Sequence, residues 1–302
     1  MKKAIVGYTG FVGSNICKNM NFDNYYNSKN VTEGYNSNPD LLIYAGIKAE
    51  KYIANAYPYN DICVIYEAIK NIKKINPKKI VLISTIDVYK NSFDKNEDEE
   101  DIANLEPYGL NRYYLEKYIE KNFDDYLIIR LPALFGINIK KNYIYDLKTL
   151  IPSKLKTKKY EELLSQDSDL NQYYEYENSE FYKVKSDIDK EKLKEKLKAL
   201  NFTSLNFTDE DAVFQFFNLD YLADIIVKAL KNNIKKLNIA VEPVKAKELY
   251  KYVYNEEFNN KISDNPPYYN FKTKYDTIFE GQNGYIFDKG SVLADVKKFI
   301  KE

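Results

Sequence analysis

Short apolar runs alternate with segments of helical periodicity through the first half of the chain. Runs at residues 4–8, 41–45, 80–83 and 127–131 have the length of buried strands, and a weaker strand is expected at Tyr25 and Tyr26. Residues 11–20, 62–75 and 113–123 carry apolar side chains at helical spacing. Strands that alternate with helices predict an α/β protein with a doubly wound parallel sheet covered on both faces.

The alternation stops after Gly136 and resumes near residue 213. Residues 153–200 are polar and charged, and residues 186–200 are expected to form an exposed helix with Leu193, Leu197 and Leu200 as a narrow apolar stripe. We interpret this segment as a solvated excursion, with a mobile cover over a ligand site as the alternative. A strand at 213–217, helices at 222–230, 246–254 and 292–300, and a strand at 237–241 are expected to follow.

This pattern predicts two interleaved parts. Residues 1–150, rejoined by residues 210–242, would form the sheet domain, and residues 151–209 and 243–302 would form a smaller substrate-binding part. No Gly/Ser-rich or Pro-rich linker separates them.

Composition excludes several kinds of chemistry. The 302 residues include 45 basic and 45 acidic side chains, so no concentrated basic surface is expected and nucleic-acid binding is disfavoured. The chain has no histidine and two cysteines, which excludes a Ser-His-Asp triad and the usual zinc sites, and no metal is expected. Since 30 residues are tyrosine, none is assigned a function from its type alone.

Targeting and membrane segments are not expected. After Met1-Lys2-Lys3 only residues 4–6 form an apolar run before Gly7, whereas a signal peptide needs about 7–15 apolar residues. No run approaches the roughly 18 apolar residues of a membrane span. A cytoplasmic protein without membrane contact is the expectation.

The segment from Lys3 to Gly13 holds the most specific motif. A predicted strand runs into glycines at positions 7, 10 and 13 and then into a predicted helix. Glycines let the backbone approach a pyrophosphate, and the helix N-terminus offers oriented N–H donors. The strand–turn–helix context therefore predicts a dinucleotide site.

Several further motifs resemble the extended short-chain dehydrogenase/reductase family, of the NAD-dependent epimerase/dehydratase type. The G-x-x-G-x-x-G spacing is similar to that family's glycine motif. The Ser/Thr-rich segment 84–89, the segment 106–116 with Pro-Tyr-Gly and Glu116, Arg130 to Gly136, and residues 217–224 resemble its other motifs in the same order. The resemblance covers residues 4–254 and is weaker over the last 45 or so. It implies a Rossmann-type fold and hydride transfer at a carbon of a nucleotide-activated sugar.

The resemblance also implies site residues. Tyr108 would move the proton, Thr85 or its neighbour Ser84 would hold the substrate oxygen, and Arg112 stands where the family has lysine. Arginine keeps the charge but does not release its proton, so a relay through this position is in doubt. Tyr113 and Lys117 form a rival Tyr-x-x-x-Lys pair outside the Pro-Tyr-Gly context. The expected cofactor contacts are Gly7, Thr9, Gly10, Phe11, Val12, Gly13, Asn27, Ser28, Lys29, Ala45, Gly46, Tyr108 and Arg112.

The cofactor is expected to be NADP, with NAD as the alternative. The loop after the second strand reads Asn27-Ser28-Lys29-Asn30, without the carboxylate that takes the ribose 2′-hydroxyl in NAD-selective sheets. Ser28 and Lys29 could instead hold a 2′-phosphate.

The expected partners and function leave alternatives open. A nucleotide sugar is the expected substrate, with reductase and epimerase not distinguished and a dehydratase disfavoured, since the segment Thr85-Ile86-Asp87 offers at most half of the added acid/base pair. A catalytically weak dinucleotide-binding protein, acting as a sensor or assembly partner, is the second hypothesis. A homodimer is expected through apolar seams on two predicted helices, unless those seams pack only on the chain's own sheet. Their members are Ile65, Ile69, Ile72, Tyr114, Leu115, Tyr118 and Ile119.

Overall fold

A computed structural model describes all residues 1–302. Contacts divide the chain into two compact units. Unit 1 comprises residues 1–139, 213–244 and 268–295, and unit 2 comprises residues 140–212, 245–267 and 296–302. No helix of the chain combines the length and the apolar character that crossing a membrane requires.

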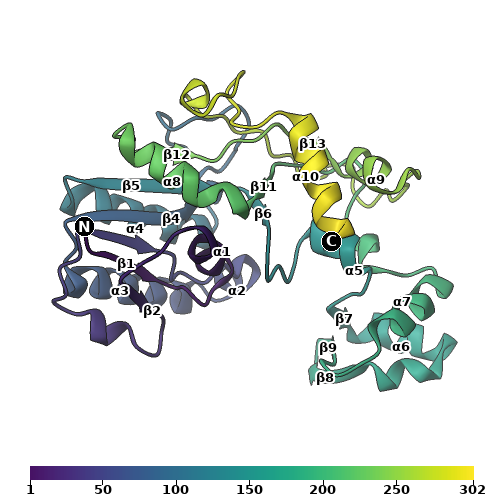
Figure 1. Ribbon diagram of the computed structural model, residues 1–302. Helices are drawn as coiled ribbons and strands as arrows, with labels where there is room; N and C mark the ends of the chain where they lie inside the picture. The colour runs from purple at the N-terminus through teal and green to yellow at the C-terminus, as the bar shows by residue number, and fades with distance from the viewer. The chain divides into compact units, whose positions relative to one another are not determined.

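Unit 1 is built on a six-stranded sheet in the order β12-β5-β4-β3-β1-β2 (Figure 1). Every neighbouring pair of strands is parallel. The strands are β1 (Lys3–Val6), β2 (Asn24–Tyr26), β3 (Leu41–Tyr44), β4 (Lys79–Thr85), β5 (Tyr126–Leu131) and β12 (Lys236–Asn238). Strand order reverses between β1 and β3, which creates the crevice at the carboxyl ends of the strands where doubly wound sheets bind ligands.

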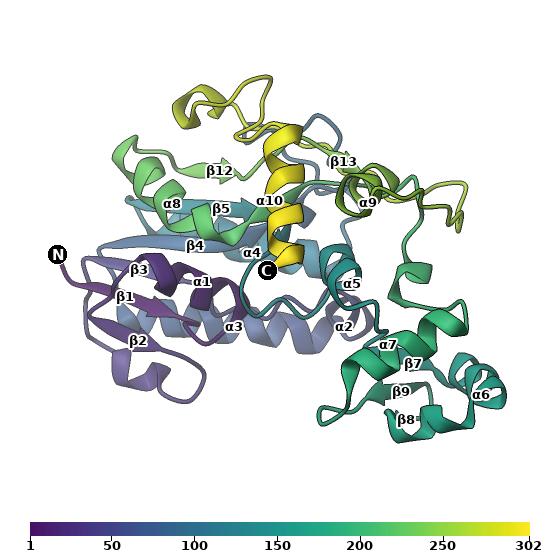
Figure 2. The same ribbon diagram turned by 45° about the vertical axis from the view of Figure 1, so that its right-hand side comes forward.

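Helices cover both faces of this sheet, so the predicted fold class is confirmed (Figures 1 and 2). Helices α1 (Phe11–Asn19) and α8 (Leu222–Lys231) contact each other on one face. Helices α3 (Pro58–Ile75) and α4 (Pro107–Asn122) pack together on the other, with the short α2 (Lys51–Ala56) beside them. The 3-10 turns of this unit are η1 (Val31–Gly34), η2 (Ile86–Val88), η5 (Leu219–Tyr221) and η6 (Asp276–Phe279).

The apolar seams proposed for a dimer lie mostly inside unit 1. Ile65, Ile72, Leu115 and Ile119 are buried against the sheet residues of the same core. Tyr114 is 51% exposed. The periodic apolar positions of α3 and α4 are therefore used first to cover the chain's own sheet, as amphipathic helices of an α/β fold require.

Two predicted elements differ in the structure for visible reasons. Helix α4 begins at Pro107, since proline suits a first helical position, and not at Tyr113. The expected strand 213–217 is two strands, β10 (Val213–Phe214) and β11 (Phe216–Asn218), and β11 pairs with β6 (Ala133–Phe135). They separate at Gln215, whose buried amide donates to the carbonyls of Val241 (2.6 Å) and Phe271 (2.9 Å).

The remaining elements near the C-terminus are β13 (Val244–Lys245), α9 (Ala246–Tyr254) and α10 (Lys289–Lys301).

Residues 268–295 belong to unit 1 by their contacts, although the sequence grouped them with the smaller part. The buried carboxylate of Glu97 accepts hydrogen bonds from the backbone N–H of Asn238 (2.7 Å), the Thr273 hydroxyl (2.6 Å) and the backbone N–H of Lys274 (3.0 Å). Burial raises the pKa of Glu97, and these three bonds offset part of that rise. This carboxylate ties the late segment to the sheet.

Unit 2 holds a hydrophobic core of its own, so the solvated-excursion interpretation of residues 153–200 is wrong. Strands β7 (Lys154–Lys156), β9 (Phe181–Val184) and β8 (Tyr174–Asn178) form an antiparallel sheet in that order. With it lie α6 (Thr157–Gln166), η3 (Ser168–Gln172) and α7 (Lys190–Ala199). Leu155, Leu163, Leu170, Leu193 and Leu197 are each at most 1% exposed. The unit also contains α5 (Tyr143–Thr149) and η4 (Ser204–Phe207).

Candidate active site

The glycine turn between β1 and α1 requires glycine at two positions. Gly7 has φ +95°, and a Cβ there would lie 2.5 Å from the carbonyl oxygen of Ala45. A Cβ on Gly13 would lie 2.1 Å from the carbonyl oxygen of Gly7, so helix α1 packs directly on the turn. Helix α1 begins at Phe11 with no side-chain cap and no acidic residue in its first turn. Its first N–H groups are therefore left for an anionic ligand.

A cavity of about 720 Å³ opens over this turn. Most of the predicted site residues line it: Gly7, Thr9, Gly10, Phe11, Val12, Asn27, Ser28, Ala45, Gly46, Ser84, Thr85, Tyr108 and Arg112. Gly13 and Lys29 do not line it, since Gly13 is buried at the helix–turn contact and Lys29 is exposed. The volume lies within the range of about 300–1,000 Å³ that small-molecule sites have.

Part of the cavity wall was not anticipated from the sequence. Helix α3 contributes Cys63, Glu67 and Asn71, which follow one another at four-residue spacing and so share one helical face. Lys48, in the loop after β3, also lines the cavity. A stripe of small and polar residues on the helix after the third strand is the signal that could have identified this wall.

Tyr108 is positioned by the first turn of α4. Its amide donates to Oδ1 of Asn55 (2.9 Å), and the next residue is Gly109, where a Cβ would lie 1.9 Å from the carbonyl oxygen of Asp87. Helix α4 can therefore approach the end of β4 closely enough to set the phenol beside Thr85. Burial raises the pKa of Tyr108. The positive charges of Arg112 and Lys51 and hydrogen bonding with Thr85 each lower this pKa, but burial outweighs them.

Arg112 is held by partners other than a ligand. Its guanidinium forms a buried ion pair with Asp61, and it donates to the carbonyl oxygens of Lys48 (2.8 Å) and Tyr108 (3.2 Å). The guanidinium carbon lies 3.9 Å from the centre of the Tyr108 ring. Asp61 also accepts a hydrogen bond from Asn111 (2.8 Å). The cation four residues after Tyr108 thus stacks on the tyrosine while a carboxylate balances its charge.

Ser84 and Thr85 have different surroundings. The Ser84 hydroxyl donates to Glu116 (2.5 Å), and Glu116 is fully buried in an ion pair with Arg130 (2.6 Å). Arg130 in turn donates to the Tyr89 hydroxyl (2.6 Å). Glu116, Arg130 and Tyr89 therefore form one buried polar network, and the Ser84 hydroxyl is hydrogen-bonded into it. Thr85 remains the hydroxyl that faces Tyr108.

The rival pair lies away from the cavity. The Tyr113 hydroxyl donates to Glu100 (3.0 Å). Lys117 forms ion pairs with Glu100 and, at 3.0 Å, with Glu120. Neither Tyr113 nor Lys117 lines the cavity that contains Tyr108.

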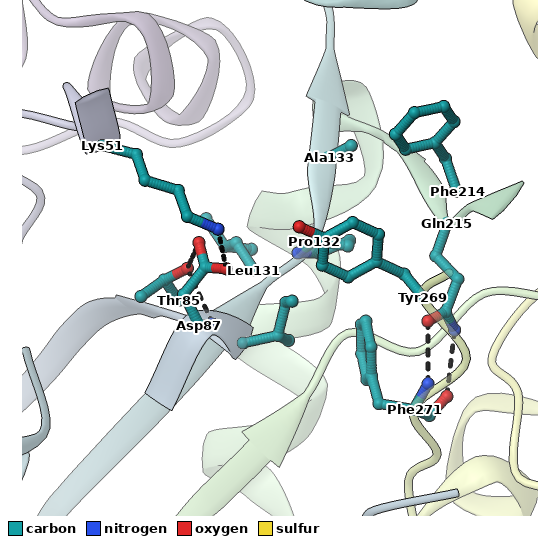
Figure 3. A pocket seen from close by; sticks show the side chains of 11 residues that line it. Lys51, Thr85, Asp87, Leu131, Pro132, Ala133, Phe214, Gln215, Tyr269 and Phe271 are labelled. Carbon is teal, nitrogen blue, oxygen red and sulfur yellow. Dashed lines mark hydrogen bonds and ion pairs between the residues drawn. The ribbon is translucent and has the colours of Figure 1, made fainter. Parts of the chain in front are cut away.

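A second cavity of about 210 Å³ is also lined by Thr85 (Figure 3). It shares Thr85, Leu131 and Pro132 with the first cavity. Its charged groups are Lys51 and Asp87, whose Nζ and Oδ1 atoms lie 2.7 Å apart. Phe214, Tyr269 and Phe271 form aromatic walls, and the Tyr269 hydroxyl points into the same space (Figure 3). Lys51 was not predicted as a site residue, and Asp87 was considered beside Thr85 without an assigned role.

Comparisons with solved structures give full-length matches. A dTDP-4-dehydrorhamnose reductase from Clostridium acetobutylicum matches with TM-score 0.66 and 12% identity, over 100% of both chains. The same enzyme from Bacillus anthracis, in complex with NADP, matches with TM-score 0.65 and 14% identity over 100% of this chain and 99% of that one. A UDP-N-acetylglucosamine 4-epimerase from Bacillus cereus matches with TM-score 0.60 and 14% identity over 100% of both.

No family model and no curated protein matches the sequence. At identities this low the structural likeness concerns the fold. The resemblance inferred from the motifs is confirmed at that level: the chain has, over its full length, the fold of the extended short-chain dehydrogenase/reductases that reduce or epimerise sugar nucleotides.

Proposed function

We propose that this protein is an NAD(P)-dependent enzyme that reduces or epimerises a nucleotide-activated sugar, with Tyr108 as the acid/base. The observation that carries the proposal is that Tyr108 and Thr85 both line the cavity over the glycine turn, and that Thr85 also lines the smaller second cavity. The names of the matching structures, reductases and 4-epimerases of dTDP- and UDP-sugars, support the same substrate class.

The first cavity fits a dinucleotide. The uncapped start of α1 would bind the pyrophosphate through backbone N–H groups, and Asn27 and Ser28 would face the ribose next to the adenine. A bound nicotinamide would supply or accept the hydride. Thr85 would polarise the substrate carbonyl and Tyr108 would donate the proton that completes an alcohol.

The surroundings of Tyr108 favour proton donation. Burial raises its pKa, and Asp61 balances the charge of Arg112, the nearest cation that could stabilise a phenolate. Tyr108 is therefore a neutral phenol near pH 7, which is the form that reduction of a ketone requires. This favours the reductase over the epimerase, because an epimerase must also use the phenolate.

The same ion pair supports a second hypothesis. Because Arg112 is engaged by Asp61 and by the Lys48 carbonyl, it offers less charge to Tyr108 than an unpaired lysine would. A protein that binds the dinucleotide and turns over slowly or not at all is consistent with this arrangement.

Turnover of a panel of keto-sugar nucleotides with NADPH and NADH tests the proposal. Tyr108→Phe should lower kcat by about 10²–10⁴-fold with cofactor affinity unchanged, because it removes only the general acid. Tyr113→Phe on the same helix is the matched control and should be nearly silent. Arg112→Lys should keep substantial activity. A dead Tyr113→Phe with an active Tyr108→Phe contradicts the assignment, and a parent that binds nucleotide without any turnover favours the binding protein.

The nucleotide preference is tested separately. We propose that NADP(H) binds more tightly than NAD(H), because the loop after β2 contains no carboxylate and Lys29 follows the cavity residues Asn27 and Ser28. Calorimetry on both nucleotides should show this difference, and Lys29→Ala should reduce it. Equal affinities in the parent would refute the preference.

A further inference from the structure

Four side chains form a continuous polar path from the buried tyrosine to solvent. Thr85 and Tyr108 line the same cavity, and Thr85 lies close enough to lower the pKa of the Tyr108 phenol. The Thr85 hydroxyl donates to Oδ2 of Asp87 (3.3 Å). The other oxygen of Asp87 accepts from Lys51 (2.7 Å). The Lys51 side chain is 45% exposed, whereas Tyr108 is 7% exposed. The path therefore begins at the buried proton donor and ends at a group that water can reach.

The path matters because the residue four positions after Tyr108 cannot release a proton. Arg112 stays charged at any working pH. It is also fixed by Asp61 and by two carbonyl oxygens. A lysine amine, in contrast, can lose and regain a proton, and Lys51 is the lysine that reaches the cavity next to Thr85 (Figure 3).

We propose that Thr85, Asp87 and Lys51 relay protons between Tyr108 and solvent, with Lys51 as the exchanging end. This inference rests on the proposed function. After Tyr108 has given its proton to the substrate oxygen, the Thr85 hydroxyl proton passes to the phenolate. The Asp87 carboxylate takes a proton from the Lys51 ammonium on Oδ1 and, after the carboxyl group turns, gives it to the Thr85 oxygen. The neutral amine is reprotonated by water. Only protons move, and each group returns to its starting state.

The titratable and charged groups around the path agree with this direction. Asp87 and Tyr269 face Lys51, and Arg112 faces Tyr108, with Asp61 behind it. Burial lowers the pKa of Lys51, but attraction to Asp87 and hydrogen bonds with Asp87 and Tyr269 outweigh it, so its pKa is raised. Lys51 is therefore an ammonium at rest and can supply the proton.

A purely structural ion pair would behave differently. Lys51 and Asp87 are 45% and 21% exposed, and an exposed ion pair contributes little to stability. If the pair only stabilised the fold, Lys51→Arg would retain full function, since arginine keeps the charge. If Lys51 relays protons, Lys51→Arg should fail because arginine does not release one.

Steady-state oxidation of NADPH by a keto-sugar nucleotide, followed in H₂O and D₂O across pH, tests the relay, because Tyr108 must regain its proton between turnovers. Lys51→Arg and Lys51→Ala should each lose at least about tenfold in rate, less than Tyr108→Phe because water can replace part of the path. A small primary amine should restore Lys51→Ala. Arg112→Lys combined with Lys51→Ala should also regain activity, since it returns a releasable proton beside Tyr108. Lys18→Met is the control, because Lys18 is 44% exposed, like Lys51, and its ion pair with Asp220 lies outside both cavities.

A second readout needs no turnover. Competitive acetylation with peptide mass spectrometry measures the pKa of the Lys51 amine in the parent and in Asp87→Asn, where loss of the carboxylate should lower it. Full steady-state rates with unchanged solvent isotope effects in Lys51→Arg, when the parent does turn over, overturn the relay alone. An unchanged Lys51 pKa in Asp87→Asn also overturns it. A parent without turnover on any keto-sugar nucleotide overturns the proposed function and the relay together.

Discussion

Removing Asp61 should destabilise unit 1 more than removing one partner of an exposed ion pair would. The Asp61 and Arg112 side chains are 8% and 4% exposed, and Asp61 also accepts from Asn111 (2.8 Å). Asp61→Ala leaves a buried guanidinium that keeps only the carbonyls of Lys48 and Tyr108. Breaking a buried pair by removing one partner costs about 3–5 kcal/mol. Asp61→Asn keeps a hydrogen-bond acceptor and should cost less, about 1–3 kcal/mol.

Urea denaturation of the parent, Asp61→Ala, Arg112→Ala and the double variant measures this cost and its coupling. The double variant should be less destabilised than the sum of the single variants, because each single change leaves one uncompensated charge. Lys18→Met serves as the exposed control and should change the free energy of unfolding by less than about 1 kcal/mol. A loss below about 1 kcal/mol in Asp61→Ala, or strict additivity, would refute the view that Asp61 fixes Arg112.

Three further predictions concern other parts of the molecule. A maleimide should label Cys63 faster than Cys17, because burial raises the pKa of the Cys17 thiol. Saturating dinucleotide should slow the labelling of Cys63 alone, since Cys63 lines the large cavity. Labelling of Cys63 that dinucleotide does not change would contradict the cavity assignment. Burial raises the pKa of Asp146 to about 7, so between pH 4 and pH 7 the folded protein keeps a proton on this carboxyl that the unfolded chain releases. The free energy of unfolding should therefore fall by up to about 4 kcal/mol from pH 4 to pH 7. Asp146→Asn should remove this slope, and denaturation curves at pH 5 and pH 8 would show it. Light scattering at micromolar concentration should give the mass of a dimer. Tyr66→Lys or Tyr114→Lys should lower that mass, because Tyr66 on α3 and Tyr114 on α4 are both exposed. A monomeric parent would disprove the dimer.

The sequence predicted what depends on local order. The strand–glycine–helix segment from Lys3 onward and helix α9 follow from short-range periodicity and turn chemistry. The position of Tyr108 in the cavity followed from its Pro-Tyr-Gly context, which separates it from Tyr113.

Long-range pairing could not be predicted in the same way. Asp61 and Arg112 are 51 positions apart, Lys51 and Asp87 are 36 apart, and Glu97 and Thr273 are 176 apart. With 45 acidic and 45 basic side chains, charge pattern alone gives no reason to choose one partner over another. The core of unit 2 was missed for a related reason, since its leucines and tyrosines are sparse along the chain and meet only after β7, β8 and β9 pair.

The arginine at position 112 and the lysine at position 51 are better understood together than apart. The planar guanidinium stacks on the Tyr108 ring while its separate nitrogens pair with Asp61 and donate to two carbonyl oxygens. A lysine ammonium is a point charge without this flat surface. These contacts make Arg112 a positioning residue for the phenol. They also leave the phenol without a proton source on its own helix. The Lys51–Asp87 pair lines the second cavity together with Thr85, and it contains a group that can exchange protons with water. In this chain the orientation of the tyrosine and its reprotonation are thus assigned to two different cations on two different elements, α4 and α2.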